Sequence, residues 1–142
     1  MMVNSHIIHL CTSFVLGLTL RVVYHTFDSR RRCITSSCYL SLKRVERIVA
    51  KRHLKNVETI LSGDKTGLPE TSIDVVLLYD VLHELDKPDE ILIELHRILR
   101  PRGVLSVSDH HLKESEIVTA ITQKGWFQLL RKGQKTYSFL KI

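Results

Sequence analysis

The segment 73–79 limits the fold more than any other part of this 142-residue chain. Its run of Val75, Val76, Leu77 and Leu78 puts apolar side chains on both faces of a strand, because successive side chains of a strand point to opposite faces. A strand that is apolar on both faces is typical of a parallel sheet covered by helices on each side. The segment therefore predicts a layered α/β fold.

Helix and strand patterns alternate after residue 40. Apolar side chains at helical spacing predict helices over 41–52, 88–100 and 113–124. Strand patterns cover 56–61, 73–79, 104–108, 126–130 and 136–141. Gly133 favours an antiparallel hairpin between the last two. This order predicts a Rossmann-like, mostly parallel sheet with helices on both faces and an antiparallel C-terminal edge hairpin.

The first 40 residues have a different composition from the rest. They hold all three cysteines but no Lys, Glu or Pro. Two strand-like stretches, 13–20 and 21–27, abut without room for the crossover that joins parallel strands, and 28–40 reads as a long connection. We therefore expect 1–40 to be an atypical N-terminal segment, degenerate or from a shifted reading frame. Residues 41–142 are then the C-terminal part of the domain, which is incomplete at its N-terminus.

Composition narrows the classes of function and location. Three cysteines without CxxC spacing argue against a disulfide framework and a zinc site, so we expect a reduced, cytoplasmic protein. The apolar stretch 7–20 is too short for a stable membrane span. The net charge of +6 includes a basic run over 43–55, which the solvated face of an amphipathic helix explains. We therefore expect no nucleic-acid partner.

Five short motifs follow one another after residue 60: Ser62-Gly63-Asp64, Gly67-Leu68-Pro69, the segment 73–77, Val81-Leu82-His83 and the segment 94–103. Together they resemble class I S-adenosylmethionine-dependent methyltransferases, and the type 11 group in particular, over Ser41–Ile142. This resemblance implies S-adenosylmethionine as cofactor and a small-molecule methyl acceptor. Arg102 replaces the first glycine of the family's Pro-Gly-Gly motif, and we expect Gly103 to supply the flexible backbone there.

The resemblance also assigns cofactor contacts. It implies that Asp64 accepts a hydrogen bond from the adenine amino group, and that the loop holding Gly63 and Lys65 lies along the adenine. It places Asp80 against the methionine part or the transferred methyl group. Asp28 is the one candidate in the N-terminal segment for the acidic residue that binds the ribose. The alternative for Asp64 is that it only stabilises the turn in which it lies.

Histidines that follow strand ends are the candidate general bases. Methyl transfer needs alignment and, for a poor nucleophile, a base, and imidazole exchanges its proton near neutral pH. His83 and His110 are the candidate catalytic residues, with His111 beside them. The alternative for His83 is an interior histidine satisfied by backbone. The triplet Asp109-His110-His111 also occurs in a phosphoesterase group, but the further Asp-rich motifs of a two-metal site are missing, so we expect no metal.

The family's first motif, an acidic residue followed by GxGxG, is absent from this chain. Its glycines let backbone amides approach the methionine carboxylate. We therefore expect the methyltransferase activity of this chain to be impaired. The second hypothesis is that the chain is a non-catalytic, methyltransferase-like binding partner or subunit. In that hypothesis the missing central strand exposes an apolar sheet edge, which allows the chain to form a homo-oligomer or to pair with another chain.

Overall fold

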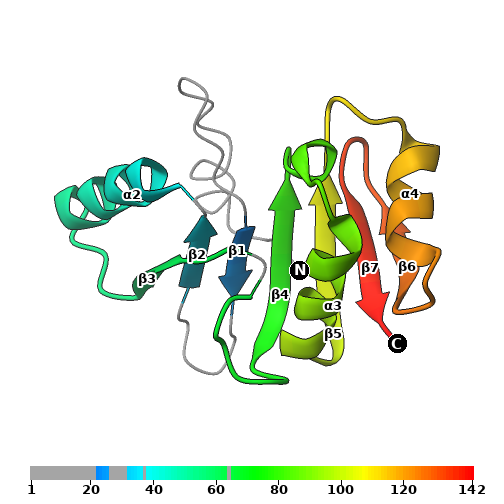
Figure 1. The fold of residues 1–142 in the computed structure, drawn as a ribbon, viewed down its shortest axis with the longest axis horizontal. Helices are drawn as coiled ribbons and strands as arrows, with labels where there is room; N and C mark the ends of the chain where they lie inside the picture. The colour runs from blue at the N-terminus through cyan, green and yellow to red at the C-terminus, as the bar shows by residue number, and fades with distance from the viewer. Residues whose placement is uncertain (1–21, 26–31, 37, 64) are drawn as a thin grey trace.

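The computed structural model describes residues 22–25, 32–36, 38–63 and 65–142 (Figure 1). They form a seven-stranded sheet in the order β3-β2-β1-β4-β5-β7-β6. The elements are β1 (Val22–His25), β2 (Arg32–Ser36), α2 (Tyr39–Lys51), β3 (Val57–Leu61), β4 (Ile73–Tyr79), the 3-10 turn η1 (Leu82–Glu84), α3 (Pro88–Ile98), β5 (Leu99–Ser108), α4 (Glu114–Thr122), β6 (Phe127–Lys132) and β7 (Tyr137–Lys141).

The two faces of β4 lie in different cores, as its apolar run predicted. Val76 and Leu78 are fully buried in the larger core with side chains of α3 and α4, including Leu92 and Ile117. Leu77 faces the other way and joins Ile34, Leu42 and Val45, of which the last two belong to α2. Helices therefore cover both faces of the sheet, and the predicted α/β class is confirmed.

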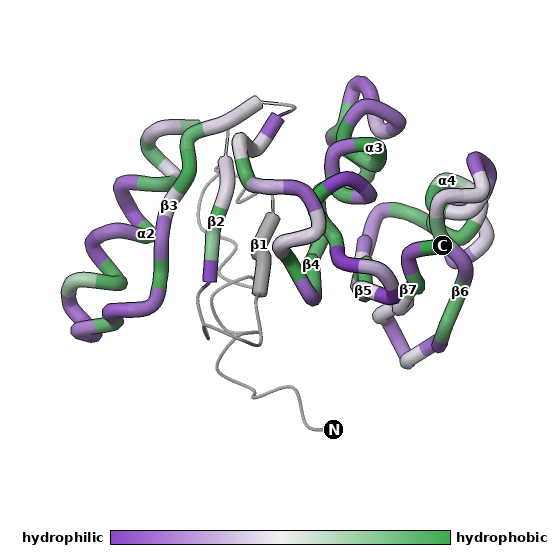
Figure 2. Tube along the Cα trace, turned by 90° about the horizontal axis from the view of Figure 1, so that it is seen from below, coloured by the Kyte–Doolittle hydropathy of each residue, from purple (hydrophilic) through white to green (hydrophobic). Residues whose placement is uncertain are grey.

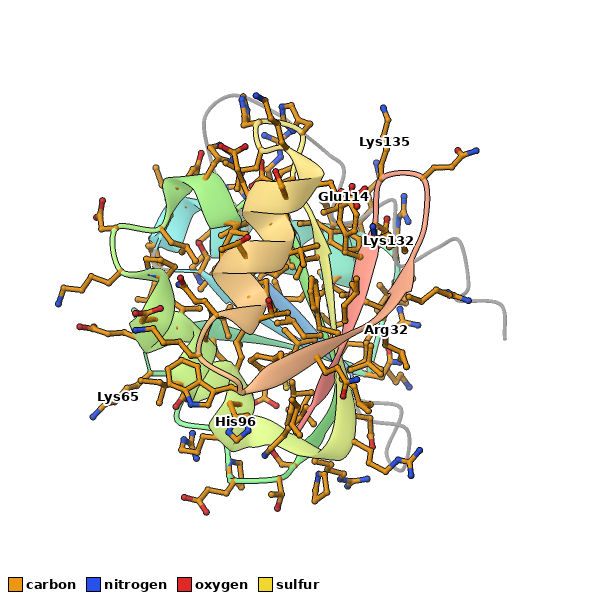
Figure 3. All side chains as sticks on the ribbon, turned by 90° about the vertical axis from the view of Figure 1, so that its right-hand side faces the viewer. Arg32, Lys65, His96, Glu114, Lys132 and Lys135 are labelled. Carbon is orange, nitrogen blue, oxygen red and sulfur yellow. The ribbon has the colours of Figure 1, made fainter. Side chains whose placement is uncertain are left out.

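The helices differ in their place along the sheet. Figure 2 shows α2 beside β2 and β3, and α3 and α4 toward the opposite end of the sheet. Glu114 at the start of α4 forms an ion pair with Lys132 of β6, and the two side chains lie together in Figure 3. None of the helices in the described ranges is long and apolar enough to cross a membrane.

The strand directions confirm the predicted C-terminal hairpin. β4 pairs with β5 in parallel, and β2 pairs with β3 in parallel. β7 is antiparallel to both β5 and β6, which places the hairpin at one edge of the sheet. β1 is the exception in the centre, because it runs antiparallel to both β2 and β4 (Figure 1).

Two N-terminal strands differ from the sequence-based expectation. β2 was not predicted, because its five residues include the polar Thr35 and Ser36, which are nevertheless buried. β1 occupies the centre of the sheet and pairs with β4, so β4 has no open edge. The expectation that a missing central strand exposes an apolar sheet edge is therefore wrong. β1 and β2 lie next to each other as an antiparallel pair, which needs no crossover helix. The edge strands of the sheet are β3 and β6.

The junction between α3 and β5 corrects two details. The helix ends at Ile98 rather than at residue 100. Arg102 itself adopts the left-handed conformation, with φ of 63°. Gly103 is required for a different reason than flexibility, because a Cβ there would lie 2.8 Å from the carbonyl oxygen of Arg100.

A buried ionic network ties the loop after β3 to α3. Glu94 Oε1 accepts hydrogen bonds from the Thr66 backbone N–H at 2.9 Å and from the Thr66 hydroxyl at 2.6 Å. Arg97 Nε donates to Glu94 Oε2 at 2.8 Å, and Arg97 Nη2 donates to the Leu68 carbonyl at 2.7 Å. The Arg97 hydrogen bond lowers the pKa of Glu94 to about 2, against the opposing effect of burial and with help from Thr66. The network fixes the loop that carries the predicted adenine contacts.

We predict that Glu94→Gln lowers the free energy of unfolding at neutral pH by about 3 kcal/mol, because the charged partner of Arg97 and Thr66 is lost. The folded state depresses the pKa of Glu94, so its contribution is present above the ordinary value of 4.5 and is lost as pH falls toward about 2. Urea unfolding of both proteins should show a difference that shrinks below pH 4.5. The control is Glu90→Gln in the exposed Lys87 pair. A difference that stays constant with pH would contradict the assignment.

We also predict that nuclear Overhauser spectra contain strong Hα–Hα contacts between β1 and β4. The antiparallel register pairs Val23 with Leu77, Tyr24 with Val76 and His25 with Val75. In an antiparallel ladder the Cα atoms of alternate pairs approach to about 4.5 Å, which brings their Hα atoms together. The parallel pair β4–β5 is the internal control, since it should lack such contacts. Their absence between β1 and β4 would contradict the direction of the central strand.

Candidate functional site

The carboxyl ends of four strands meet at one edge of the sheet, which we call the carboxyl rim. β2 and β4 point the same way because β1 is antiparallel to both, and β3 and β5 are parallel to them. In the β4–β5 ladder Tyr79 pairs with Ser108, so the residues that follow, Asp80 and Asp109, both lie at the rim. Ligands of open α/β sheets bind beyond this edge.

Asp80 turns the chain out of β4 in a strained conformation. Its φ is 52°, in the left-handed region that Asp tolerates better than most residues, and its N–H donates to the Ser108 carbonyl at 2.7 Å. Its Oδ1 accepts from the His110 backbone N–H at 3.1 Å and lies 2.7 Å from His110 Nδ1. Both side chains are open to solvent, with 37% of Asp80 and 53% of His110 exposed.

Asp109 makes the corresponding contacts in the interior. Its side chain is 0% exposed, and its two oxygens lie 2.8 and 2.9 Å from His83 Nδ1. The backbone N–H groups of His83 and His111 donate to the same carboxylate at 3.1 and 3.0 Å. Asp109 therefore ties the turn after β4 to the end of β5.

The pKa of Asp109 is lowered although burial alone would raise it. Burial is the largest influence, but the His83 side chain and the backbone N–H groups of His111 and His83 hydrogen-bond to the charged form and outweigh it together. The carboxylate is thus held ionised in a site that solvent does not reach. An ionised carboxylate can only accept hydrogen bonds, so the imidazole nitrogen that faces it must carry a hydrogen.

The three rim histidines form one cluster. The His83 ring centroid lies 4.1 Å from that of His111, and the His110 centroid lies 3.9 Å from that of His111. His83 and His110 are 6.3 Å apart. No group of three or more His, Cys, Asp or Glu side chains suited to a metal ion occurs among the residues that the structure describes. Asp109 of the Asp-His-His triplet instead accepts hydrogen bonds from its neighbours.

The structure gathers some of the predicted site residues and leaves others apart. His83, His110 and Asp80 lie together at the rim. Gly63 and Lys65 lie in the loop after β3, and both are exposed. Lys65 points away from the body of the protein in Figure 3. Asp64 and Asp28 lie outside the described residues. The residue at the carboxyl end of β2 is Ser36, and Asp28 precedes that strand in the sequence.

The sequence does not predict the contacts of two supporting carboxylates. Asp109 is expected at the rim together with Asp64 and Asp80, because it directly follows a buried strand, but its contact with His83 is not expected. Glu94 and Arg97 enter the sequence analysis only as residues of a family motif. Their i,i+3 spacing on a helix predicts an ion pair, and the structure shows that the pair also holds Thr66 and the loop after β3.

The rim fits part of S-adenosylmethionine. A Cβ built on Gly63 meets nothing within 4 Å, so the space beside this loop is open, and the exposed Asp80 carboxylate offers a hydrogen-bond acceptor. The open space suits the adenosine portion, and the Asp80 carboxylate suits the methionine portion, whose ammonium group donates hydrogen bonds. The methionine carboxylate requires donors, which the family takes from the loop after the first strand. Here β1 ends with His25 at the opposite edge, so no such loop lies at the rim among the described residues.

Comparison with known proteins places this fold. The sequence model of a methyltransferase domain family matches residues 26–107. A comparison with curated proteins gives no match. Among solved structures, an S-adenosylmethionine-dependent methyltransferase from Aquifex aeolicus is 22% identical with a TM-score of 0.66; the alignment covers 77% of this chain and 66% of that one.

Two other solved structures show the range of proteins with this fold. The [4+2]-cyclase SpnF is 16% identical with a TM-score of 0.62, and the alignment covers 70% of this chain and 43% of SpnF. The N-methyltransferase NodS from Bradyrhizobium japonicum, in complex with S-adenosylhomocysteine, is 12% identical with a TM-score of 0.57; coverage is 77% and 65%. The chain thus spans about two thirds or less of these structures. These likenesses show the fold.

The family match includes residues 26–40, which sequence reasoning assigned to the atypical segment, and it runs through β5. It covers more than half of the 142 residues. The seven-stranded sheet with helices on both faces agrees with it. The chain therefore belongs to the methyltransferase domain family, as its motifs predicted, and is a class I type 11 methyltransferase segment.

Proposed function

We propose that this chain binds S-adenosylmethionine at the carboxyl rim and transfers its methyl group to a small-molecule acceptor. The observation that carries the proposal is the pairing of two imidazoles with two carboxylates at that rim, His83 with Asp109 and His110 with Asp80. Family membership supports the reaction type. The class of methyl acceptor and the activity of this particular chain are part of what we propose.

The cofactor contacts in the proposal come from the two loops of the rim. When bound, S-adenosylmethionine supplies an electrophilic methyl group on a sulfonium. Asp64, flanked by Gly63 and Lys65, would bind the adenine, and the anchored Thr66 holds this loop in place. Asp80 would face the methionine portion. Asp28, the expected ribose ligand, is left out of this proposal, because the strand ends on either side of it, His25 and Arg32, pair at the opposite edge of the sheet.

The two paired histidines supply the proposed proton acceptors. A base assists methyl transfer when the attacking atom of the acceptor carries a proton. His83 and His110 are both at the rim, and each has Nδ1 within 2.9 Å of a carboxylate oxygen. The alternative in which backbone alone satisfies His83 is not supported, since the Asp109 side chain meets its ring.

A non-catalytic methyltransferase-like partner is the second candidate function. The reversed β1 favours it, because a loop for the methionine carboxylate is then missing from the described rim. Self-association in that case would use the edge of β3, near the exposed side chains of Tyr39, Leu40 and Leu61. Size-exclusion chromatography at high concentration tests it, since a monomer would count against this candidate.

The remaining sequence-based expectations belong to the same proposal. We infer a cytoplasmic protein without a nucleic-acid partner, in which 1–40 is a segment distinct from 41–142. The DNA upstream of the Ser41 codon tests the reading-frame hypothesis. If neither alternative frame encodes an acidic residue followed by GxGxG, the shifted-frame explanation is wrong.

We predict that isothermal titration calorimetry detects binding of S-adenosylhomocysteine, and that Asp64→Ala weakens it at least about 10-fold, since an adenine hydrogen bond to a carboxylate contributes about 1.5 kcal/mol or more. The matched control is Asp74→Ala. Asp74 lies at the start of β4, at the opposite edge, where it accepts a hydrogen bond from Arg100 at 3.0 Å. Absence of binding at millimolar ligand would remove the enzymatic proposal and leave family membership intact.

A further inference from the structure

The two histidine–carboxylate pairs at the rim differ in their surroundings. Asp109 is 0% exposed and His83 is 22% exposed, whereas Asp80 and His110 are 37% and 53% exposed. An ion pair open to solvent contributes little to the free energy of folding and does little to restrict its two side chains. A buried carboxylate that loses its partner strongly destabilises the folded state, so the interior pair is held far more firmly than the exposed one. The pair that can fix a ring in one orientation is therefore His83 with Asp109.

Asp109 is itself fixed by two backbone groups on different elements. The N–H of His83 belongs to η1, and the N–H of His111 follows β5. The carboxylate cannot rotate away without leaving these donors unpaired in the interior, and an unpaired buried donor destabilises the folded state. The ring of His83 thus meets an acceptor whose position the backbone determines.

The contact also determines where the proton of the neutral ring lies. A carboxylate only accepts hydrogen bonds, so Nδ1 of His83 must carry the hydrogen that points to Asp109. In the neutral imidazole the other nitrogen, Nε2, then has a free lone pair. Within the described residues Nε2 makes no hydrogen bond, and a carboxylate oxygen of Glu84 lies 3.8 Å from it.

We propose that Asp109 is a positioning residue that makes His83, rather than His110, the proton acceptor of this site, so that the methyl acceptor is a molecule with a dissociable O–H or N–H group. This rests on the proposed methyltransferase function. The proton of that group passes to Nε2 of His83, and the electron pair of the broken bond stays on the acceptor atom, which forms the bond to the methyl carbon. The pair of the broken sulfur–methyl bond stays on sulfur, which becomes neutral.

Other charged groups face His83 from each packed element. Glu84 of η1 lies 3.8 Å from Nε2, and the rings of His111 and His110 lie at 4.1 and 6.3 Å. His110 in turn is paired with Asp80. A pH profile of activity would therefore mix several ionisations, so the state of the His83 ring has to be observed directly.

The decisive experiment is nitrogen-15 NMR of the full chain with labelled histidine at about pH 8.5, where free imidazoles are neutral. In the unaltered chain we expect more than about nine tenths of the His83 rings to have an unprotonated Nε2 and a protonated Nδ1. In Asp109→Asn we expect this tautomer in less than half of the His83 rings, because the asparagine amide can donate a hydrogen bond to the ring. Asp80→Asn is the matched control and should change His110 alone; exposed His53 is the internal reference. A protonated Nε2 in the unaltered chain would overturn the proposal even if Asp109→Asn does not fold.

A second readout separates catalytic positioning from a merely structural contact. Diethyl pyrocarbonate acylates an unprotonated imidazole nitrogen, and peptide mass mapping locates the modified residue. We expect modification of His83 that saturating S-adenosylhomocysteine slows at least about 10-fold. If the ligand binds in calorimetry but leaves His83 unprotected, the proposal is wrong while the proposed function stands. If it does not bind, the proposed function fails and the catalytic assignment of the pair falls with it, whatever the ring tautomer.

Discussion

Parallel pairing of β4 with β5 is the constraint on which the site depends. The register sets Tyr79 beside Ser108, so the two chains leave the sheet at the same level and deliver Asp80 and Asp109 to one rim. Each carboxylate then meets a histidine from the other strand's turn, since Asp80 pairs with His110 and Asp109 with His83. The site is thus a cross-link between two strand ends, and shifting the register would separate both pairs.

Burial gives the two pairs different properties. Both faces of β4 are covered. The Asp109 side chain is buried and has three backbone or ring donors. Asp80 lies outside it, in a left-handed turn that exposes its carboxylate. The same rim therefore offers an interior pair that can fix a proton and an exterior pair that a polar ligand can reach. The Glu94 network fixes the neighbouring loop in a similar way.

Local patterns predicted the three α-helices and the five strands after residue 40, because apolar spacing decides which face is buried. They did not predict η1, and they placed the start of β5 at residue 104 rather than at Leu99. They placed His83 and His110 at the rim, since strand ends can be read from sequence. They did not predict β2, whose buried Thr35 and Ser36 are polar, or the direction of β1, which long-range pairing with Val75–Leu77 determines. The role of Asp109 also depends on a partner 26 residues away.

The most direct test of the central claim is a crystal structure of the chain with S-adenosylhomocysteine. We predict that the ligand lies at the carboxyl ends of β3 and β4, with the adenine beside the loop that Thr66 anchors and the sulfur facing the cluster of His83, His110 and His111. A ligand bound at the opposite edge, where β1 ends, or one that makes no contact with these three histidines, would contradict this prediction.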